Sequence, residues 1–361
     1  MIVRAARQAL LLLALALLVS ASEAAPPQAV SAAISPPTVV AGLPKAPWVG
    51  STFRNLDPEY HRASMWARAR SVILGGTWLV GERHVEPLPI VKTDAVALRE
   101  NSSRATVTWI GHSTLLVQLD GVNFLTDPTW ASRSGPFGGL LGVGRYTPPA
   151  IAFDDLPRID FVLISHDHYD HLDEPTVRHL AQQFNPRFVV PLGIKTWLAE
   201  RGITNVVELN WGESVTIGGL TVVCTPAQHG SGRTLLDQGR RLWASWAVLG
   251  SKRFYFAGDS GYYQHFQEIG EALGPFDLAA LPIGSYTPRA LAKPVHLSPE
   301  EALQAWTDLH ATKFLGIHWG TFALAREAYD EPPRRIAEEV GRRHLDADSV
   351  WILKPGVTTA W

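Results

Sequence analysis

Residues 166–173 read HDHYDHLD, and this short segment gathers side chains that bind metal ions. Histidines at positions i and i+2 of an extended chain project to the same side, and imidazole and carboxylate groups are ligands for zinc. The candidate ligands are His166, His168, Asp170 and His171. Asp167 and Tyr169 alternate out of this set and are left unassigned. The segment predicts a metal site rather than a solvated polar loop.

Three further candidate ligands follow predicted strands elsewhere in the chain: His229, Asp259 and His318. With them, the number of ligands suffices for two ions. We expect one ion on His166, His168 and His229, a second on Asp170, His171 and His318, and Asp259 as the bridge. A site built from nitrogen and oxygen ligands suits two zinc ions per chain, with manganese or iron as alternatives.

Such a pair of ions predicts hydrolytic chemistry. Two neighbouring ions lower the pKa of a bridging water, and the resulting hydroxide attacks phosphorus or a carbonyl carbon. Asp170 and Asp259 are the predicted catalytic carboxylates, with Asp259 orienting the nucleophile. The alternative of another class is a non-catalytic metal-binding protein. A missing ligand would indicate it, and no ligand is missing from the set.

The elements that must position these residues are short strands and a few helices. Predicted strands cover 114–119, 122–126 and 161–165, and predicted helices cover 174–184 and 299–310. Asp120-Gly121 is a strong hairpin signal between the first two strands. The third is an apolar run typical of a strand buried on both faces. Ser298 and Glu301 can form a capping box at the start of the second helix.

A weak internal repeat connects the two halves of the chain. LLVQLDGVNFLTD ends at Asp127, WAVLGSKRFYFAGD ends at Asp259, and an apolar strand follows each segment. Two similar halves of strands with interposed helices predict two sheets packed face to face, with helices outside. The metal site would then lie at the strand ends between the halves.

The order of these motifs resembles the metallo-β-lactamase superfamily, and within it N-acylphosphatidylethanolamine-hydrolysing phospholipase D and its bacterial relatives. The resemblance is carried by TWIGHSTLLVQLDGVNFLTDPTWASRSGP, LISHDHYDHLD, AGDSGY, LPIGSYTPR and IHWGTFALAREAYDEPP, which cover most of residues 106–333, and by FRNLDP at 53–58. It implies an α/β fold, the αββα four-layer sandwich, over residues 105–361. Residues 49–104 would form an N-terminal extension. The resemblance also implies two zinc ions on the ligands named above.

The resemblance implies roles for residues outside the ligand set. Asp127 would support the ligands without binding metal, and His112 would order the floor of the site. His296 would contact substrate and take part in catalysis, or else be a capping or surface histidine. Tyr286 and Arg289 would meet a phosphate or headgroup, or else pack their own loop.

The implied function is a phosphodiesterase of phospholipase D type that acts on N-acylphosphatidylethanolamine-like phospholipids. Attack at phosphorus would release an alcohol and leave a phosphomonoester. A small phosphodiester is a further substrate option. The alternative is a lactonase or other ester hydrolase acting on a small metabolite, similar to the L-ascorbate 6-phosphate lactonase branch. Members of the family can form homodimers, and this remains open for the chain.

Composition limits the other classes of function. The chain has 361 residues and a formal charge of −2, from 32 Lys+Arg and 34 Asp+Glu. It therefore lacks the basic excess of a nucleic-acid-binding protein. Hydrophobic residues make up 46% and charged residues 18%, a balance that excludes wholesale disorder. The single cysteine, Cys224, excludes a disulfide framework and a cysteine-rich metal site.

The N-terminal residues predict export. Arg4 and Arg7 precede the apolar run 9–21, and Ser22-Glu23-Ala24 offers a cleavage site, so residues 1–24 are expected to be a signal peptide. The run is short for a membrane span of about 20 residues. Residues 25–48 are rich in alanine and proline and predict a linker. We therefore expect a bacterial periplasmic protein.

Residues 60–83 raise the question of membrane contact. They combine arginines with Trp66 and Trp78, a mixture that suits a bilayer interface. The alternative is a helix packed on the sandwich, which is favoured because Gly75-Gly76 interrupts any long helix. Peripheral membrane association is thus one expectation for this segment, and packing is the other.

Overall fold

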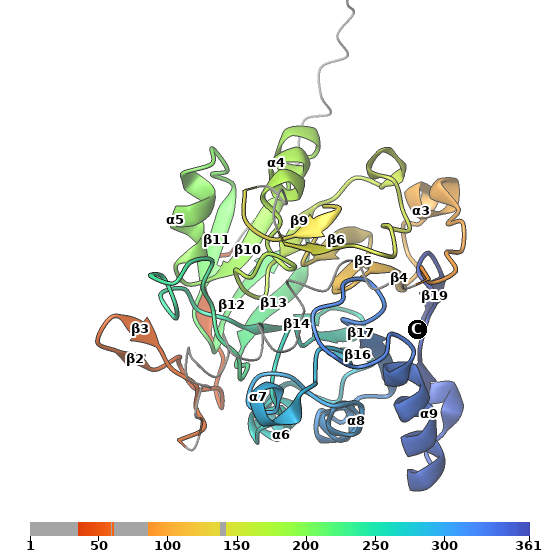
Figure 1. The fold of residues 1–361 in the computed structure, drawn as a ribbon. Helices are drawn as coiled ribbons and strands as arrows, with labels where there is room; N and C mark the ends of the chain where they lie inside the picture. The colour runs from red at the N-terminus through yellow and green to blue at the C-terminus, as the bar shows by residue number, and fades with distance from the viewer. Residues whose placement is uncertain (1–34, 59, 61–85, 138–141) are drawn as a thin grey trace, which may run out of the picture. The chain divides into compact units, whose positions relative to one another are not determined.

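The computed structural model describes residues 35–58, 60, 86–137 and 142–361. The chain divides into two units, Met1–Ser31 and Ala32–Trp361, and every described residue belongs to the second. Two β-sheets form the centre of this unit (Figure 1).

The larger sheet contains both antiparallel and parallel pairs. Its order is β1 (Thr38–Val39), β12 (Glu213–Ile217), β13 (Leu220–Thr225), β14 (Ser245–Leu249), β15 (Arg253–Phe256), β16 (Leu278–Pro282), β17 (Lys313–Ile317) and β18 (Val350–Trp351). Strands from β12 to β15 pair antiparallel, and strands from β15 to β18 pair parallel. As a result β13, β15 and β17 run in the same direction and end at one edge of the sheet.

The second sheet has the order β11 (Val206–Leu209), β10 (Arg187–Pro191), β9 (Phe161–Leu163), β6 (Val122–Thr126), β5 (Thr114–Leu119), β4 (Thr106–Gly111) and β19 (Thr358–Ala360). The predicted hairpin is β5–β6, with Leu119 opposite Val122 across the Asp120-Gly121 turn. β9 lies between parallel neighbours, β6 and β10, as its apolar sequence predicts. Two short ribbons are β2 (Trp48–Val49) with β3 (Thr52–Phe53), and β7 (Arg133–Ser134) with β8 (Val143–Gly144).

Helices cover the outer faces of both sheets. They are α3 (Ala95–Glu100), α4 (Glu174–Gln183), α5 (Ile194–Ala199), α6 (His265–Leu273), α7 (Arg289–Ala292), α8 (Pro299–Asp308) and α9 (Glu331–Arg343). Figure 1 shows α4 and α5 beside the seven-stranded sheet and α6, α8 and α9 beside the other. The capping box predicted for Ser298 and Glu301 is present at the start of α8.

Side-chain alternation along β5 shows how the layers form. Leu115 and Val117 belong to the core between the sheets, together with Val222 and Val248 of the facing sheet. Leu116 points the other way and packs in a second core with Leu180 of α4. Because successive residues of a strand face opposite sides, one strand contributes to both cores. The predicted αββα four-layer sandwich is confirmed.

The prediction of a linker over residues 25–48 needs correction for its described part. Thr38 pairs with Ser214 as β1 adds to the edge of the larger sheet, and the Val40 N–H donates to the Gly212 carbonyl at 2.7 Å. Residues 35–48 therefore pack on the sandwich. A strand of two residues, one threonine and one valine, is too short to give a strand signal in the sequence.

Several predictions fall outside the described residues. The signal peptide at 1–24 lies wholly outside them, and the Trp/Arg segment at 60–83 does so except for Tyr60. Among the residues that the structure does describe, no helix has the length and apolar character needed to cross a membrane.

Candidate metal centre

The seven predicted ligands converge at one edge of the sandwich because of the strand directions. His166 follows β9, and His229, Asp259 and His318 follow β13, β15 and β17 after short turns. Strands β13, β15 and β17 run in the same direction. The three side chains that follow their carboxyl ends therefore lie at the same edge of the sheet. The turn after β9 supplies the remaining ligands.

Three histidines form the first group. His166 Nε2 lies 2.9 Å from His168 Nδ1, and His229 Nε2 lies 3.2 Å from the same atom. Zinc–nitrogen bonds of about 2.0–2.1 Å in tetrahedral geometry place ligand nitrogens about 3.3 Å apart. The spacing of the three nitrogens therefore fits a shared ion.

The second group contains Asp170, His171 and His318. The Asp170 Oδ2 atom lies 3.3 Å from His171 Nε2 and 3.6 Å from His318 Nε2. The Nε2 atoms of both histidines are buried and have no hydrogen-bond partner among the described residues. Buried polar nitrogens are rarely left unpaired, and a metal ion would satisfy both.

Asp259 lies between the two groups. Its Oδ2 atom is 3.8 Å from His229 Nε2 and 3.3 Å from His171 Nε2. Its Oδ1 atom is 3.1 Å from His318 Nε2 and, within the part of the chain that the structure describes, makes no hydrogen bond. One carboxylate thus reaches both groups, which is the arrangement expected of a bridging ligand.

The protonation states suit cation binding. Burial lowers the pKa of His166 and of His229 well below the usual value, so both rings are neutral and can offer a lone pair. Burial alone would raise the pKa of Asp259, but His318 and His171 hold it well below the usual range. In the second group, Asp259 and Asp170 raise the pKa of His171 and that of His318, the latter to about 9, so these two rings carry protons that a divalent metal would displace on binding.

Asp127 sets the orientation of the ligand turn. This fully buried carboxylate accepts a hydrogen bond from His171 Nδ1 at 2.6 Å, which directs Nε2 of that ring toward the cluster. It also accepts from the Ser165 N–H and hydroxyl, each at 2.6 Å. Asp127 therefore contacts the candidate ligand His171 directly and reaches His166 through the neighbouring Ser165.

His112 lies beneath the second group. Its Nε2 is 3.0 Å from Asp170 Oδ2, and its backbone carbonyl accepts from the His318 N–H at 3.0 Å. Burial lowers its pKa to about 3, so the ring is neutral. His112 therefore connects the candidate ligands Asp170 and His318.

His296 stands at the rim of the cluster. Its Nδ1 lies 3.8 Å from Asp259 Oδ2, and its side chain is 19% exposed. It lines a cavity of about 280 Å³ together with His168, His229 and Tyr60. This position gives it access to a molecule bound beside the first group.

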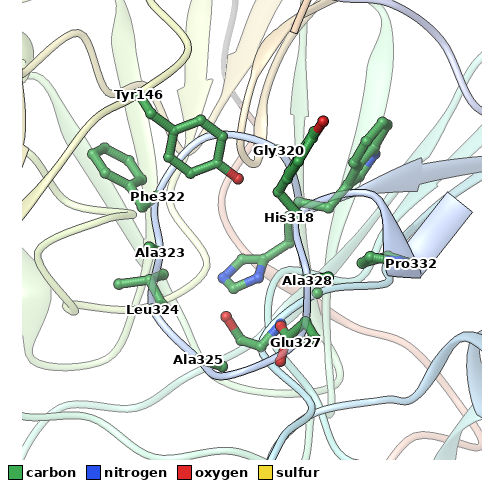
Figure 2. A pocket seen from close by; sticks show the side chains of 14 residues that line it. Tyr146, His318, Gly320, Phe322, Ala323, Leu324, Ala325, Glu327, Ala328 and Pro332 are labelled. Carbon is green, nitrogen blue, oxygen red and sulfur yellow. The ribbon is translucent and has the colours of Figure 1, made fainter. Parts of the chain in front are cut away.

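A second cavity of about 210 Å³ adjoins the other group at His318. Figure 2 shows the His318 ring and the Tyr146 hydroxyl both pointing into it. Apolar side chains such as Phe322 and Leu324 form part of its wall. The two groups of ligands therefore have separate cavities next to them.

The structure does not bring Tyr286 and Arg289 into the cluster. The buried Tyr286 hydroxyl donates to Glu331 at 2.7 Å. Arg289 donates to both oxygens of Glu301 and to the His296 carbonyl at 2.9 Å. These contacts correspond to the alternative of loop packing, because each polar group already has a partner within the fold. Arg289 reaches the site only through the backbone of His296.

Two residues without an assigned role contribute contacts at the site. Asp167 is fully buried and accepts from Gly232 N and Arg241 Nη1, each at 2.7 Å. Asn55 bonds to the backbone of His229. The FRNLDP segment signals Asn55 only through the resemblance, and nothing in the local pattern of either residue indicates these partners.

The chain is similar to known metal-dependent hydrolases in both sequence and structure. Residues 122–319 match the family model of the beta-lactamase superfamily domain. The chain is 47% identical over 259 residues to N-acyl-phosphatidylethanolamine-hydrolyzing phospholipase D 1 of Caenorhabditis elegans, covering 68% of the chain and 72% of the relative. It is 30% identical over 262 residues to a UPF0173 metal-dependent hydrolase of Solibacter usitatus, covering 71% and 99%. The structure of Igni18, a metallo hydrolase from Ignicoccus hospitalis, aligns with a TM-score of 0.56 and 25% identity over 72% of the chain and 99% of Igni18.

Proposed function

Because the chain belongs to the beta-lactamase superfamily and is a metal-dependent hydrolase, we propose that it is a dinuclear zinc phosphodiesterase of phospholipase D type. Its proposed substrates are N-acylphosphatidylethanolamine-like phospholipids. The observation that carries the proposal is the two-part ligand set, bridged by Asp259 and bordered by two cavities. A phosphodiester has two organic arms, and one cavity beside each ligand group gives each arm a place.

When bound, the two ions supply an activated water and neutralise the charge that develops on phosphate oxygens. The residues of the chain divide the remaining tasks. The three-histidine group would hold one ion, and Asp170, His171 and His318 the other. Asp259 contacts both groups and would orient the attacking water between them. Asp127 and His112 keep His171 and Asp170 in place.

Hydrolysis forms a new bond between the water oxygen and phosphorus and breaks the bond from phosphorus to the headgroup oxygen. The products are an N-acylethanolamine and a phosphatidic acid. His296 is the proposed residue that contacts the substrate during this exchange. Burial lowers its pKa to about 4, so the neutral ring acts through hydrogen bonding rather than as a fixed cation.

Contact with a membrane surface is part of the proposal, since the substrate is a lipid. Leu235 and Leu236 are 75% and 84% exposed. They lie at the tip of the segment 230–241, whose Gly230, Gly232 and Gln238 line the cavity of His296. Exposed leucines beside a lipid-binding cavity suit insertion into a bilayer surface.

The remaining assignments are also proposals. Residues 1–24 would be a signal peptide that directs the protein to the periplasm, and residues 105–361 would form the hydrolase domain. The mass of the mature protein isolated from cells tests the cleavage site. Size measurement in solution tests the homodimer.

The activity itself is tested by mass spectrometry of products. The zinc-loaded protein is incubated with vesicles of N-acylphosphatidylethanolamine, with His166→Ala as control. The expected products are phosphatidic acid and N-acylethanolamine, absent with the variant. Intact lipid after incubation with a protein that holds two zinc ions would contradict the proposal and favour a lactone or another small ester as substrate.

A further inference from the structure

The side-chain amide of Asn55 makes two hydrogen bonds to the backbone of one residue in the metal centre. Asn55 Nδ2 donates to the His229 carbonyl at 2.9 Å, and the His229 N–H donates to Asn55 Oδ1 at 3.0 Å. The two residues are 174 positions apart in the chain. One amide thus pairs with both backbone groups of a candidate ligand, as a neighbouring strand would.

His229 needs such a partner because it lies beyond the end of β13. No strand of the described chain pairs with its backbone, and the residue is only 3% exposed. Buried N–H and C=O groups require hydrogen bonds, and Asn55 satisfies one of each. The ring is held separately, since His229 Nδ1 lies 2.9 Å from the Val295 carbonyl. The remaining nitrogen, Nε2, then faces His168 and Asp259.

Asn55 is itself held in place by the fold. The Trp243 indole Nε1 donates to Asn55 Oδ1 at 3.0 Å. Two residues earlier, Phe53 is buried in the main core, and its N–H donates to the Gly239 carbonyl at 2.8 Å. Five residues later, Tyr60 lines the cavity that His229 shares. The segment around Asn55 therefore follows the wall of the site.

We propose that Asn55 is a positioning residue for the metal ligand His229, so that the N-terminal extension is part of the metal centre. This segment lies outside residues 122–319, which carry the superfamily match. The inference rests on the proposed role of His229 as a ligand. Without the amide, the ligand backbone would lose both fixed bonds, and the first ion would bind to a less ordered group of histidines.

Zinc binding tests the inference independently of any lipid substrate. Stoichiometry and affinity are measured by metal analysis and by competition with a chromophoric chelator. For Asn55→Ala we expect the stoichiometry at limiting zinc to fall from two bound ions per chain to one. The zinc affinity of the weakened site should fall about 10- to 100-fold, as is typical when a residue that orients a ligand is lost. His229→Ala should lose the same ion.

A matched control separates positioning from general stabilisation. Trp243→Phe removes the two bonds of the indole N–H, to Asn55 Oδ1 and to the Ala227 carbonyl, but leaves both bonds between Asn55 and His229. It should therefore lower the thermal stability of the metal-free protein without changing zinc affinity. Asn55→Asp retains the acceptor but not the donor and should give an intermediate affinity. Its zinc affinity also tests the inference if Asn55→Ala does not fold.

The possible failures are distinguishable. If Asn55→Ala and Asn55→Asp bind two zinc ions with unchanged affinity while His229→Ala loses one, Asn55 has only a structural role and the inference is overturned. If His229→Ala also retains both ions, the proposed ligand set is wrong.

Discussion

Asp127 is the buried group on which the orientation of His171 depends. It receives the His171 Nδ1 proton and two further hydrogen bonds from Ser165. A ligand histidine usually donates its second nitrogen to a carboxylate or carbonyl, and loss of that partner weakens metal binding or activity 10- to 100-fold. Substitution of Asp127 should therefore weaken zinc binding even though this residue is not a proposed ligand.

We predict that Asp127→Asn reduces zinc affinity and kcat/KM by about 10- to 100-fold. The neutral amide presents an N–H or a weaker acceptor to His171 and no longer stabilises the required tautomer. Metal analysis and steady-state kinetics measure the effect. Asp154→Asn, a change on the surface, is the control. Unchanged zinc affinity in Asp127→Asn would contradict the role of this carboxylate.

His296 should behave differently, because it stands at the rim. We predict that His296→Ala retains both ions and loses about 100-fold in kcat, the order typical of losing one hydrogen bond that stabilises the transition state. His179→Ala, which removes an exposed histidine on α4, should leave kcat unchanged. Loss of zinc by His296→Ala would instead identify it as a ligand.

The segment 230–241 packs against the turn that carries four of the candidate ligands, His166, His168, Asp170 and His171. Arg241 and Gly232 donate to the buried carboxylate of Asp167, and Arg233 donates to the carbonyls of Asp167 and Leu172. Tyr169 closes the contact by donating to the Arg233 carbonyl at 2.8 Å. The two residues that alternate out of the ligand set thus hold the ligand turn against a second element.

We predict that Arg241→Met lowers the free energy of unfolding by about 3 kcal/mol, because it leaves the Asp167 carboxylate buried without its charged partner. Urea denaturation of the metal-free protein measures this loss. Arg240→Met, an exposed neighbour, should change stability by less than about 0.5 kcal/mol. Adding Asp167→Asn to Arg241→Met should recover part of the loss, and an additive double variant would show that the two groups are not coupled.

At the level of the complete protein, the exposed side chains of Leu235 and Leu236 are the proposed point of contact with the lipid surface that contains the substrate. We predict that Leu235→Ser combined with Leu236→Ser weakens binding to phospholipid vesicles at least tenfold, since each buried leucine contributes about 1.5–3 kcal/mol. Vesicle sedimentation measures binding without turnover. Hydrolysis of a short-chain substrate below its micelle concentration should be unchanged.

Val96→Ser provides the matched control for that pair. Val96 is 58% exposed on α3, away from the cavities that adjoin the ligand groups. Val96→Ser should bind phospholipid vesicles as strongly as the unmodified protein does. Equal weakening by both variants would indicate a nonspecific effect of surface hydrophobicity, and no weakening by the leucine pair would place the membrane contact elsewhere.

Features that depend on neighbouring residues could be predicted from the sequence. The Asp120-Gly121 turn, the β9 strand and the capping box of α8 all lie where the local pattern places them. The spacing of histidines in HDHYDHLD and the strands that precede His229, Asp259 and His318 indicated convergence on one edge. These features follow from backbone geometry over a few residues, together with the resemblance to a family.

Other features exist only because distant segments meet. The partners of Asn55, Asp167 and Tyr286 lie between 45 and 174 positions away, and no local periodicity encodes such pairs. The same limit applies to β1, whose two residues become a strand only against β12, and to the cavities beside the ligands. Residue types and spacing determine which chemistry is available. Tertiary packing decides which polar groups are already satisfied within the fold and which remain free to meet metal and substrate, because a buried group can be assigned only when all its partners are in place.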